Sequence, residues 1–296
     1  MNFMRKVKFI FCRSEKIKNK EIIEEKQLQD LMRYVIGNKL PFMMGKIGGT
    51  ELFILQTIEF YRKRLYKMAC EQGCRWSGIY PEDVYILKRF TMVMKDAIGE
   101  ADILLHWQKY FEAYFINRYG IKIKGIFREW LLVPWGSENP WTKELRGRKV
   151  LVISPFESSI RKQYQKREKL FKNQDILPDF ELYTLKAVQS LGGICEEGYK
   201  DWFEALEVMM QQIEKIEFDI ALIGCGAYGL PLAAKVKRMG KVAVHMGGDL
   251  QMLFGIMGKR WEKNPTVQKI VNEYWIYPER SERPEFADMV EDGCYW

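Results

Sequence analysis

The hydrophobic residues of this chain recur at two spacings, one typical of helices and one of buried strands. Positions three to four residues apart predict helices over 21–36, 83–97, 107–119, 158–171, 200–216 and 230–239, and another that begins near Thr50. Short apolar runs predict strands over 41–47, 101–106, 149–154, 180–185, 218–223 and 241–245. Because runs such as VLVI and KVAV have no polar side, we expect parallel strands covered by helices on both faces.

This alternation of strands and helices predicts an α/β fold of the doubly wound, Rossmann-like type with a mostly parallel sheet. We expect residues 1–40 to form an N-terminal helical extension and residues 41–296 a single α/β domain. A boundary between two lobes is expected near residues 134–148, after the Pro- and Gly-rich loop VPWGSENPW. In such folds, ligands bind at the carboxyl ends of the strands.

Composition narrows the class of protein. A hydrophobic fraction of 47% over 296 residues is enough for a full core, which excludes a disordered or collagen-like chain. The six cysteines include no CxxC pair, so neither a zinc ribbon nor a thioredoxin-like motif is expected. The apolar run 9–12 is too short for a signal peptide, and we expect a cytoplasmic protein with reduced thiols.

The net charge of +8 favours an anionic partner. The charge is spread along the chain without a nucleic-acid-binding module, so nucleic acid is not expected. One basic cluster, residues 61–67, either contacts anionic lipid peripherally at the inner membrane face or is simply a solvated surface. In a second cluster, Arg161 lies one turn into a helix that opens at a strand end, where it would reach a phosphate.

The segment GCGAYG, residues 224–229, is a GxGxxG sequence between a predicted strand and a predicted helix. Glycines there let the backbone approach a diphosphate at a helix N-terminus. A dinucleotide enzyme would carry an acid at the end of the next strand, where this chain has His245, with Asp249 the nearest acid. The alternative is a tight turn that binds nothing.

Two further strand ends carry candidate chemistry. In KIGGTEL, residues 46–52, Glu51 lies near a helix start beside two glycines; alternatively, Thr50 caps the helix and Glu51 complements its dipole. A neutral His245 would accept a proton from an attacking hydroxyl, with Asp249 orienting it, unless it is a structural histidine. His106 presents the same choice.

KIGGTEL resembles the RFGDGEL-type segment of bacterial glycosyltransferases with the GT-D fold, whose Asp-x-Glu motif serves metal and sugar-nucleotide binding. The run DIALIGCGAYGLPLAAKVKRMGKVAVHMGG is similar to their nucleotide-binding half. The endings GKRW and EDGCYW resemble those of proteins encoded among bacterial polysaccharide-assembly genes. The resemblance spans Pro41 to the C-terminus.

The resemblance implies a glycosyltransferase of hexosyltransferase type in capsule, exopolysaccharide or glycoprotein glycan synthesis. It implies a nucleotide-sugar donor, with a UDP-sugar favoured, and a glycan or lipid-linked acceptor. Glu51 matches the motif glutamate and would be the ligand of a divalent cation, Mn²⁺ or Mg²⁺. Gly49 stands where the family has aspartate, so metal dependence stays open, with Asp249 or basic residues compensating.

These interpretations give three candidate catalytic residues, Glu51, His245 and Asp249. The candidate nucleotide-sugar-binding residues are Lys46, Gly48, Gly49, Thr50, Arg161, Gly224, Gly226, Tyr228, Gly247, Gly248 and Arg260. Two alternatives remain from other classes. One is another Rossmann-like enzyme, either an NAD oxidoreductase or a methyltransferase that uses S-adenosylmethionine; the other is a non-catalytic nucleotide-sugar-binding scaffold.

Overall fold

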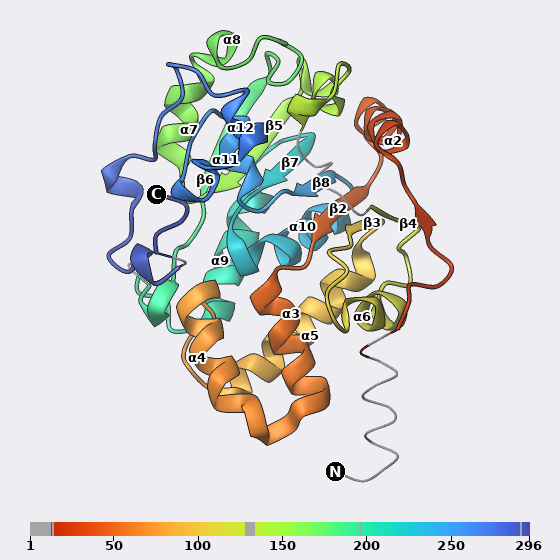
Figure 1. Ribbon diagram of the computed structural model, residues 1–296, viewed down its shortest axis with the longest axis vertical. Helices are drawn as coiled ribbons and strands as arrows, with labels where there is room; N and C mark the ends of the chain where they lie inside the picture. Colours follow the sequence, from red (N-terminus) through yellow and green to blue (C-terminus); the bar gives the residue numbers. More distant parts are fainter. Residues whose placement is uncertain (1–12, 14, 128–133, 196, 291) are drawn as a thin grey trace.

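One sheet of parallel strands runs through the molecule and carries helices on both faces (Figure 1). The structure is a computed structural model that describes residues 13, 15–127, 134–195, 197–290 and 292–296. The strands are β1 (Glu21–Ile22), β2 (Phe42–Lys46), β3 (Ile103–Leu105), β4 (Gly125–Phe127), β5 (Lys149–Ser154), β6 (Glu181–Lys186), β7 (Ile220–Ile223) and β8 (Val242–His245). Their order across the sheet is β1-β4-β3-β2-β8-β7-β5-β6, and each pairing is parallel.

Alternation along each strand divides the core into two layers. In β2, Met43 packs in the layer that contains α3 (Gly49–Gln56), α4 (Tyr66–Ser77), α5 (Val84–Glu100), α6 (Glu112–Tyr119), α9 (Trp202–Glu214) and α10 (Gly229–Arg238). Its neighbour Met44 packs in the layer of α2 (Glu25–Gly37), α7 (Glu157–Tyr164), α8 (Arg167–Leu170), α11 (Asp249–Leu253) and α12 (Pro265–Gln268). Successive side chains of a strand point to opposite faces, so apolar runs are needed where both faces are covered.

The predicted strands are all present, and the predicted α/β fold is confirmed. The sheet, expected to be mostly parallel, is parallel in every pairing of the described strands. The sequence reading missed the two short strands at one edge, β1 and β4. Part of the predicted helix 21–36 is therefore strand, because the Glu21 N–H donates to the Lys124 carbonyl at 3.1 Å and holds this stretch extended. The expected helical extension 1–40 thus contains an edge strand as well as α2, while residues 1–12 and 14 lie outside the described residues.

Two predicted helices are shorter or interrupted. The helix expected over 107–119 begins only at Glu112, because Gln108 and Phe111 adopt positive φ angles of 58° and 64° in the preceding turn. The helix expected over 158–171 is split into α7 and α8. The first of these differences frees residues 107–111 to form a loop at the end of β3.

The expected lobe boundary, residues 134–148, is a crossing between the two halves of the sheet, from β4 to β5. It packs tightly against α2: Trp141 and Leu145 are fully buried, and the Trp141 N–H donates to Gln29 Oε1 at 2.6 Å. Val133, the first residue of the predicted loop, lies outside the described residues.

The connections after the central strands diverge. The loops that follow β2 and β7 lead to α3 and α10 in one layer, whereas those that follow β5 and β8 lead to α7 and α11 in the other. Neighbouring strands whose connections leave toward opposite faces create a crevice at their carboxyl ends, where doubly wound proteins bind ligands. Throughout the described ranges, every helix is too short or too polar to cross a bilayer.

Candidate active site

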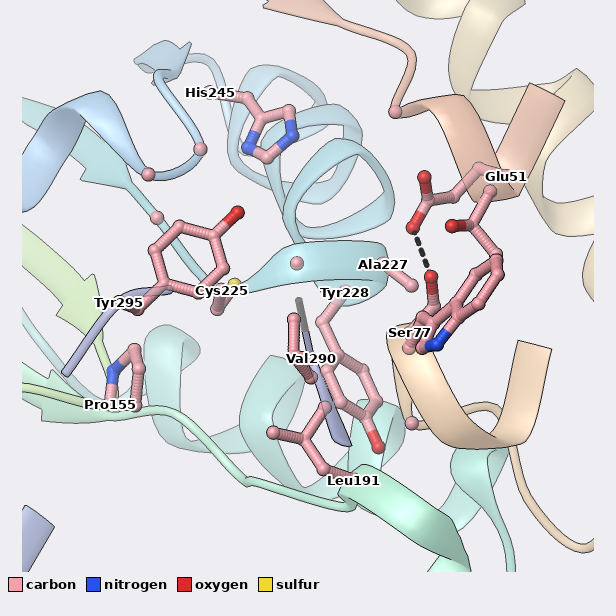
Figure 2. A pocket seen from close by; sticks show the side chains of 18 of the residues that line it. Glu51, Ser77, Pro155, Leu191, Cys225, Ala227, Tyr228, His245, Val290 and Tyr295 are labelled. Atoms are coloured by element: carbon pink, nitrogen blue, oxygen red, sulfur yellow. Dashed lines mark hydrogen bonds between the residues drawn. The ribbon is translucent and has the colours of Figure 1, made fainter. Parts of the chain in front are cut away.

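A cavity of about 580 Å³ opens at the carboxyl ends of the central strands. Figure 2 shows Glu51 and Ser77 on one wall and Tyr295 and Pro155 on the opposite wall. Most of the predicted site residues line it: Lys46, Gly48, Gly49, Thr50, Glu51, Gly224, Gly226, Tyr228, His245, Gly247, Gly248, Asp249 and Arg260. The volume is in the range of small-molecule sites.

Arg161 is the predicted site residue that the structure does not bring to this cavity. Its guanidinium is half exposed on α7 and pairs with Glu157 Oε1 at 3.0 Å. As predicted, it lies one turn into a helix that follows a strand, but its guanidinium pairs with the first residue of that helix and does not line the cavity. We therefore no longer count Arg161 among the candidate nucleotide-sugar-binding residues.

Glu51 is a buried carboxylate on the first turn of α3. Its Oε1 accepts a hydrogen bond from Ser77 Oγ at 2.9 Å (Figure 2). Burial raises the pKa of Glu51, against the opposing effects of its own backbone N–H, Ser77 and the Lys109 ammonium. The helix is capped by Gly48 rather than by Thr50, and a Cβ at position 48 would meet Glu51 Oε2 at 1.9 Å. Gly48 therefore makes room for this carboxylate.

Lys46 and Asp249 join two neighbouring strand ends. Lys46 Nζ lies 2.8 Å from Asp249 Oδ2, and both side chains are largely buried. Gly247, with φ of 62°, lets the lysine pass, since a Cβ there would meet its Cε at 2.6 Å. The Asp249 carboxylate is thus neutralised by a lysine within the protein.

The three glycines of GCGAYG have different functions. A Cβ at Gly224 would meet the Gly247 carbonyl at 2.6 Å, and a Cβ at Gly229 would meet the His245 ring at 2.1 Å, so these two glycines allow close packing. Gly226, with φ of 55°, has no atom of the described residues within 4 Å of its Cβ position and faces open space among them. Of the three, only Gly226 leaves its backbone free for a ligand to approach.

His245 lies buried at the end of β8, against the start of α10. Burial, helped by the nearby Lys46 ammonium, lowers the pKa of His245 to about 3, so its imidazole is neutral. Its Nδ1 has no hydrogen-bond partner among the described residues. A base of such low pKa accepts a proton weakly near neutral pH, and the predicted proton-accepting function fits Glu51 better.

Tyr228 lines the cavity, but its ring and hydroxyl already contact other residues of the protein. Its ring stacks on Trp202 with centroids 4.9 Å apart, and its hydroxyl lies 2.8 Å from Ser190 Oγ. Arg260 lies at the rim, where Nη1 donates to the Tyr295 hydroxyl at 2.8 Å. These contacts fix the rim around the cavity.

The loop after β3 contributes two residues that the sequence reading missed, Trp107 and Lys109. The loop folds around the buried carboxylate of Glu112, whose Oε2 accepts the Lys109 N–H at 3.3 Å and lies 3.4 Å from His106 Nε2. Burial raises the pKa of Glu112 to about 7, and N–H groups of the loop oppose this. His106 therefore helps to hold this loop in place through its contact with Glu112.

Other missed lining residues come from distant parts of the chain: Ser77 ends α4, and Tyr295 and Trp296 end the sequence. Trp107 and Lys109 had a usable signal, because they follow a predicted parallel strand. Ser77 had none, since its place depends on how α4 folds back against α3.

Fold and site together define a doubly wound α/β protein with a cavity at the carboxyl edge of its sheet, lined by several glycines and a few charged side chains. The GT-D fold-like domain family matches residues 23–253, and the chain belongs to this family. That membership supports a glycosyltransferase.

Among solved structures, the chain is similar to a highly conserved domain of unknown function 1792 described as having a distinct glycosyltransferase fold. The identity is 10%, over 77% of this chain and 78% of that chain, with a TM-score of 0.43. A selenomethionine-substituted structure of domain of unknown function 1792 is 9% identical, over 89% of this chain and 93% of that chain, with a TM-score of 0.45. No curated protein matches the chain.

Proposed function

We propose that this protein transfers a sugar from a nucleotide-sugar donor, preferably a UDP-sugar, to an acceptor hydroxyl during capsule, exopolysaccharide or glycoprotein glycan synthesis. One observation carries the proposal: a single cavity brings together the Glu51 carboxylate, the Lys109 ammonium and the open turn at Gly226. These are the groups that the reaction needs: a proton acceptor, positive charge and a backbone that admits phosphate.

The proposed reaction is a displacement at the anomeric carbon of the donor sugar. The acceptor oxygen forms a bond to that carbon, while the bond between the carbon and the diphosphate oxygen breaks. The electron pair leaves with the nucleoside diphosphate, and the hydroxyl proton passes to the Glu51 carboxylate. A raised pKa brings this base nearer to neutral pH, where proton transfer is more effective.

Ligand-induced stabilisation tests the donor site. UDP, GDP, ADP, CDP and dTDP are compared by thermal shift, and we expect UDP to raise the unfolding temperature most, because a ligand that binds only the folded state stabilises it. S-adenosylmethionine and NAD serve as controls for the two other Rossmann-like classes. Absence of a shift with every nucleoside diphosphate would contradict the proposal, whereas a shift without turnover of any UDP-sugar would favour the non-catalytic scaffold.

We also propose that the protein binds peripherally to the inner membrane face and takes a lipid-linked acceptor there. The cluster at residues 61–67 supports this, since the side chains of Lys63, Arg64 and Lys67 are exposed outside the cavity. We expect binding to phosphatidylglycerol vesicles in a sedimentation assay, because each basic residue near an anionic surface contributes about 1 kcal/mol. Replacing these three residues by glutamine should release the protein; retention by neutral phosphatidylcholine vesicles would argue against an electrostatic contact.

A further inference from the structure

We infer that Lys109 supplies the positive charge that receives the donor diphosphate, in place of a divalent cation. The inference rests on the proposed function and goes further, because it names the group that binds the leaving diphosphate and removes the metal requirement. Three observations lead to it: the carboxylates of the cavity, the place of the Lys109 ammonium, and the support of its loop.

The carboxylates of the cavity do not fit a divalent cation. Mg²⁺ and Mn²⁺ favour several oxygen ligands, and no group of three His, Cys, Asp or Glu side chains that could hold a metal occurs in the described part of the chain. Asp249 is paired with Lys46 at 2.8 Å, and Gly49 has no side chain. Glu51 remains, and it already accepts a hydrogen bond from Ser77. No step of the reaction is therefore assigned to a metal.

The Lys109 ammonium lies where a side chain at position 49 would begin. A Cβ built on Gly49 would be 2.9 Å from Lys109 Nζ. The absence of a side chain at this position thus leaves space for a cation directly above the turn after β2. Where the family that the sequence resembles has an aspartate side chain, this chain has the Lys109 ammonium instead.

Lys109 is also available to a ligand. Its side chain is exposed at the cavity wall, and no ion pair joins it to a carboxylate of any described residue. By contrast, the Lys46 ammonium on the same wall is committed to Asp249. The Glu51 and Glu112 carboxylates lie near enough to feel the Lys109 charge but form no ion pair with it. A diphosphate that enters beside Gly49 would therefore meet an ammonium that is not held in an ion pair by any described residue.

The loop that carries Lys109 is held in place before any ligand binds. The buried Glu112 carboxylate accepts the Lys109 N–H at 3.3 Å, and the Trp107 ring centroid lies 5.7 Å from Lys109 Nζ. A charge positioned in advance costs less to reorganise when the negative charge of the leaving diphosphate develops. His106 and Glu112 are positioning residues in this arrangement.

The first test measures binding by calorimetry in EDTA and again with Mn²⁺, using the nucleoside diphosphate selected by the panel above and its parent nucleoside. We expect wild-type affinity for the diphosphate to agree within about twofold between the two conditions. Lys109→Gln should weaken the diphosphate by about 10–100-fold, the usual value of a hydrogen bond to a charged group, and leave the nucleoside unchanged. Lys109→Arg should retain most of the affinity.

A matched control removes the same charge elsewhere. Lys88 is exposed on α5 outside the cavity, so Lys88→Gln should bind the diphosphate as the wild type does. Binding that requires Mn²⁺, or an unchanged affinity in Lys109→Gln, would overturn the inference but leave the proposed glycosyl transfer standing. Absence of binding to every nucleoside diphosphate, with or without Mn²⁺, would overturn both.

Position 49 gives a reciprocal test. Gly49→Asp places a carboxylate beside the Lys109 ammonium, whereas Gly49→Asn adds a side chain of the same shape without the charge. In EDTA, the aspartate variant should bind the diphosphate about tenfold more weakly than the asparagine variant, because the ammonium is then neutralised within the protein. Equal affinities of the two variants would count against Lys109 as the diphosphate partner.

Discussion

Glu51→Gln is expected to lower the rate of sugar transfer by about 10²–10⁴-fold, the usual contribution of a general base. Glutamine keeps the shape of the side chain and can still accept the hydrogen bond of Ser77, so binding of the nucleoside diphosphate should change little. The measurement is release of UDP from UDP-sugars, with water or a glycan as acceptor. A variant as active as the wild type would show that another group accepts the proton.

The same substitution should stabilise the protein. Burial raises the pKa of Glu51 in the folded state, so the folded protein holds this proton more tightly than the unfolded chain. The related stability is therefore present at low pH and is lost as pH rises from the unfolded pKa through the folded pKa. At neutral pH, Glu51→Gln should have a higher free energy of unfolding, measured with urea; a lower value would mean that the charged carboxylate stabilises the fold.

Ser77→Ala tests by pH dependence whether Glu51 is the group that accepts the proton. Ser77 donates a hydrogen bond to the Glu51 carboxylate and so opposes the rise in its pKa. Without that bond, the pKa of Glu51 should rise further, and the acid side of the kcat/KM profile should move to higher pH. An unchanged profile would mean that a group other than Glu51 gives rise to the acid side of the pH profile.

Gly229→Ala is expected to destabilise the protein by about 1–3 kcal/mol or more, the usual cost of overpacking a core. A Cβ at this position would lie 2.1 Å from the buried His245 ring, so the ring or the start of α10 must shift. Urea unfolding gives the value. Gly136→Ala is the control, because no atom of the described residues lies within 4 Å of its Cβ position, and it should change the free energy of unfolding by no more than about 0.5 kcal/mol.

A double-mutant cycle isolates the cause of the Gly229→Ala effect. His245→Ala removes the ring, so adding Gly229→Ala in that background should cost much less than in the wild type. Equal costs in the two backgrounds would mean that the alanine clashes with something other than the ring. The result would also show whether the third glycine of GCGAYG serves packing rather than ligand binding.

The limits of sequence-based inference are clearest at the GCGAYG turn. Its position between a strand and a helix was predictable from apolar periodicity, because each element needs apolar residues at its own spacing to bury its faces. Which of its three glycines has open space beside it was not predictable. That depends on His245 and Gly247 from the next strand end, which crowd Gly229 and Gly224 and leave Gly226 as the glycine of this motif with open space among the described residues.

The edge strands β1 and β4 illustrate the same limit in the fold. Each has only two or three residues, which is too short to show a period. β1 forms because Glu21 and Ile22 pair with residues 125 and 126 of β4, and β4 itself also pairs with β3. Strand pairing of this kind is decided by partners about 100 residues away, and not by local pattern.

By itself, the sequence determined the doubly wound parallel fold, the edge of the sheet that carries the cavity and part of the cavity wall, since periodicity and chain order fix which loops follow strands. The tertiary structure decided which charged side chains of the described residues pair with one another and which remain without an ion pair. It paired Lys46 with Asp249 and Arg161 with Glu157, and it set Lys109 beside Gly49. Such pairs join side chains from different loops over a few ångströms, and chain order alone does not specify distances at that scale.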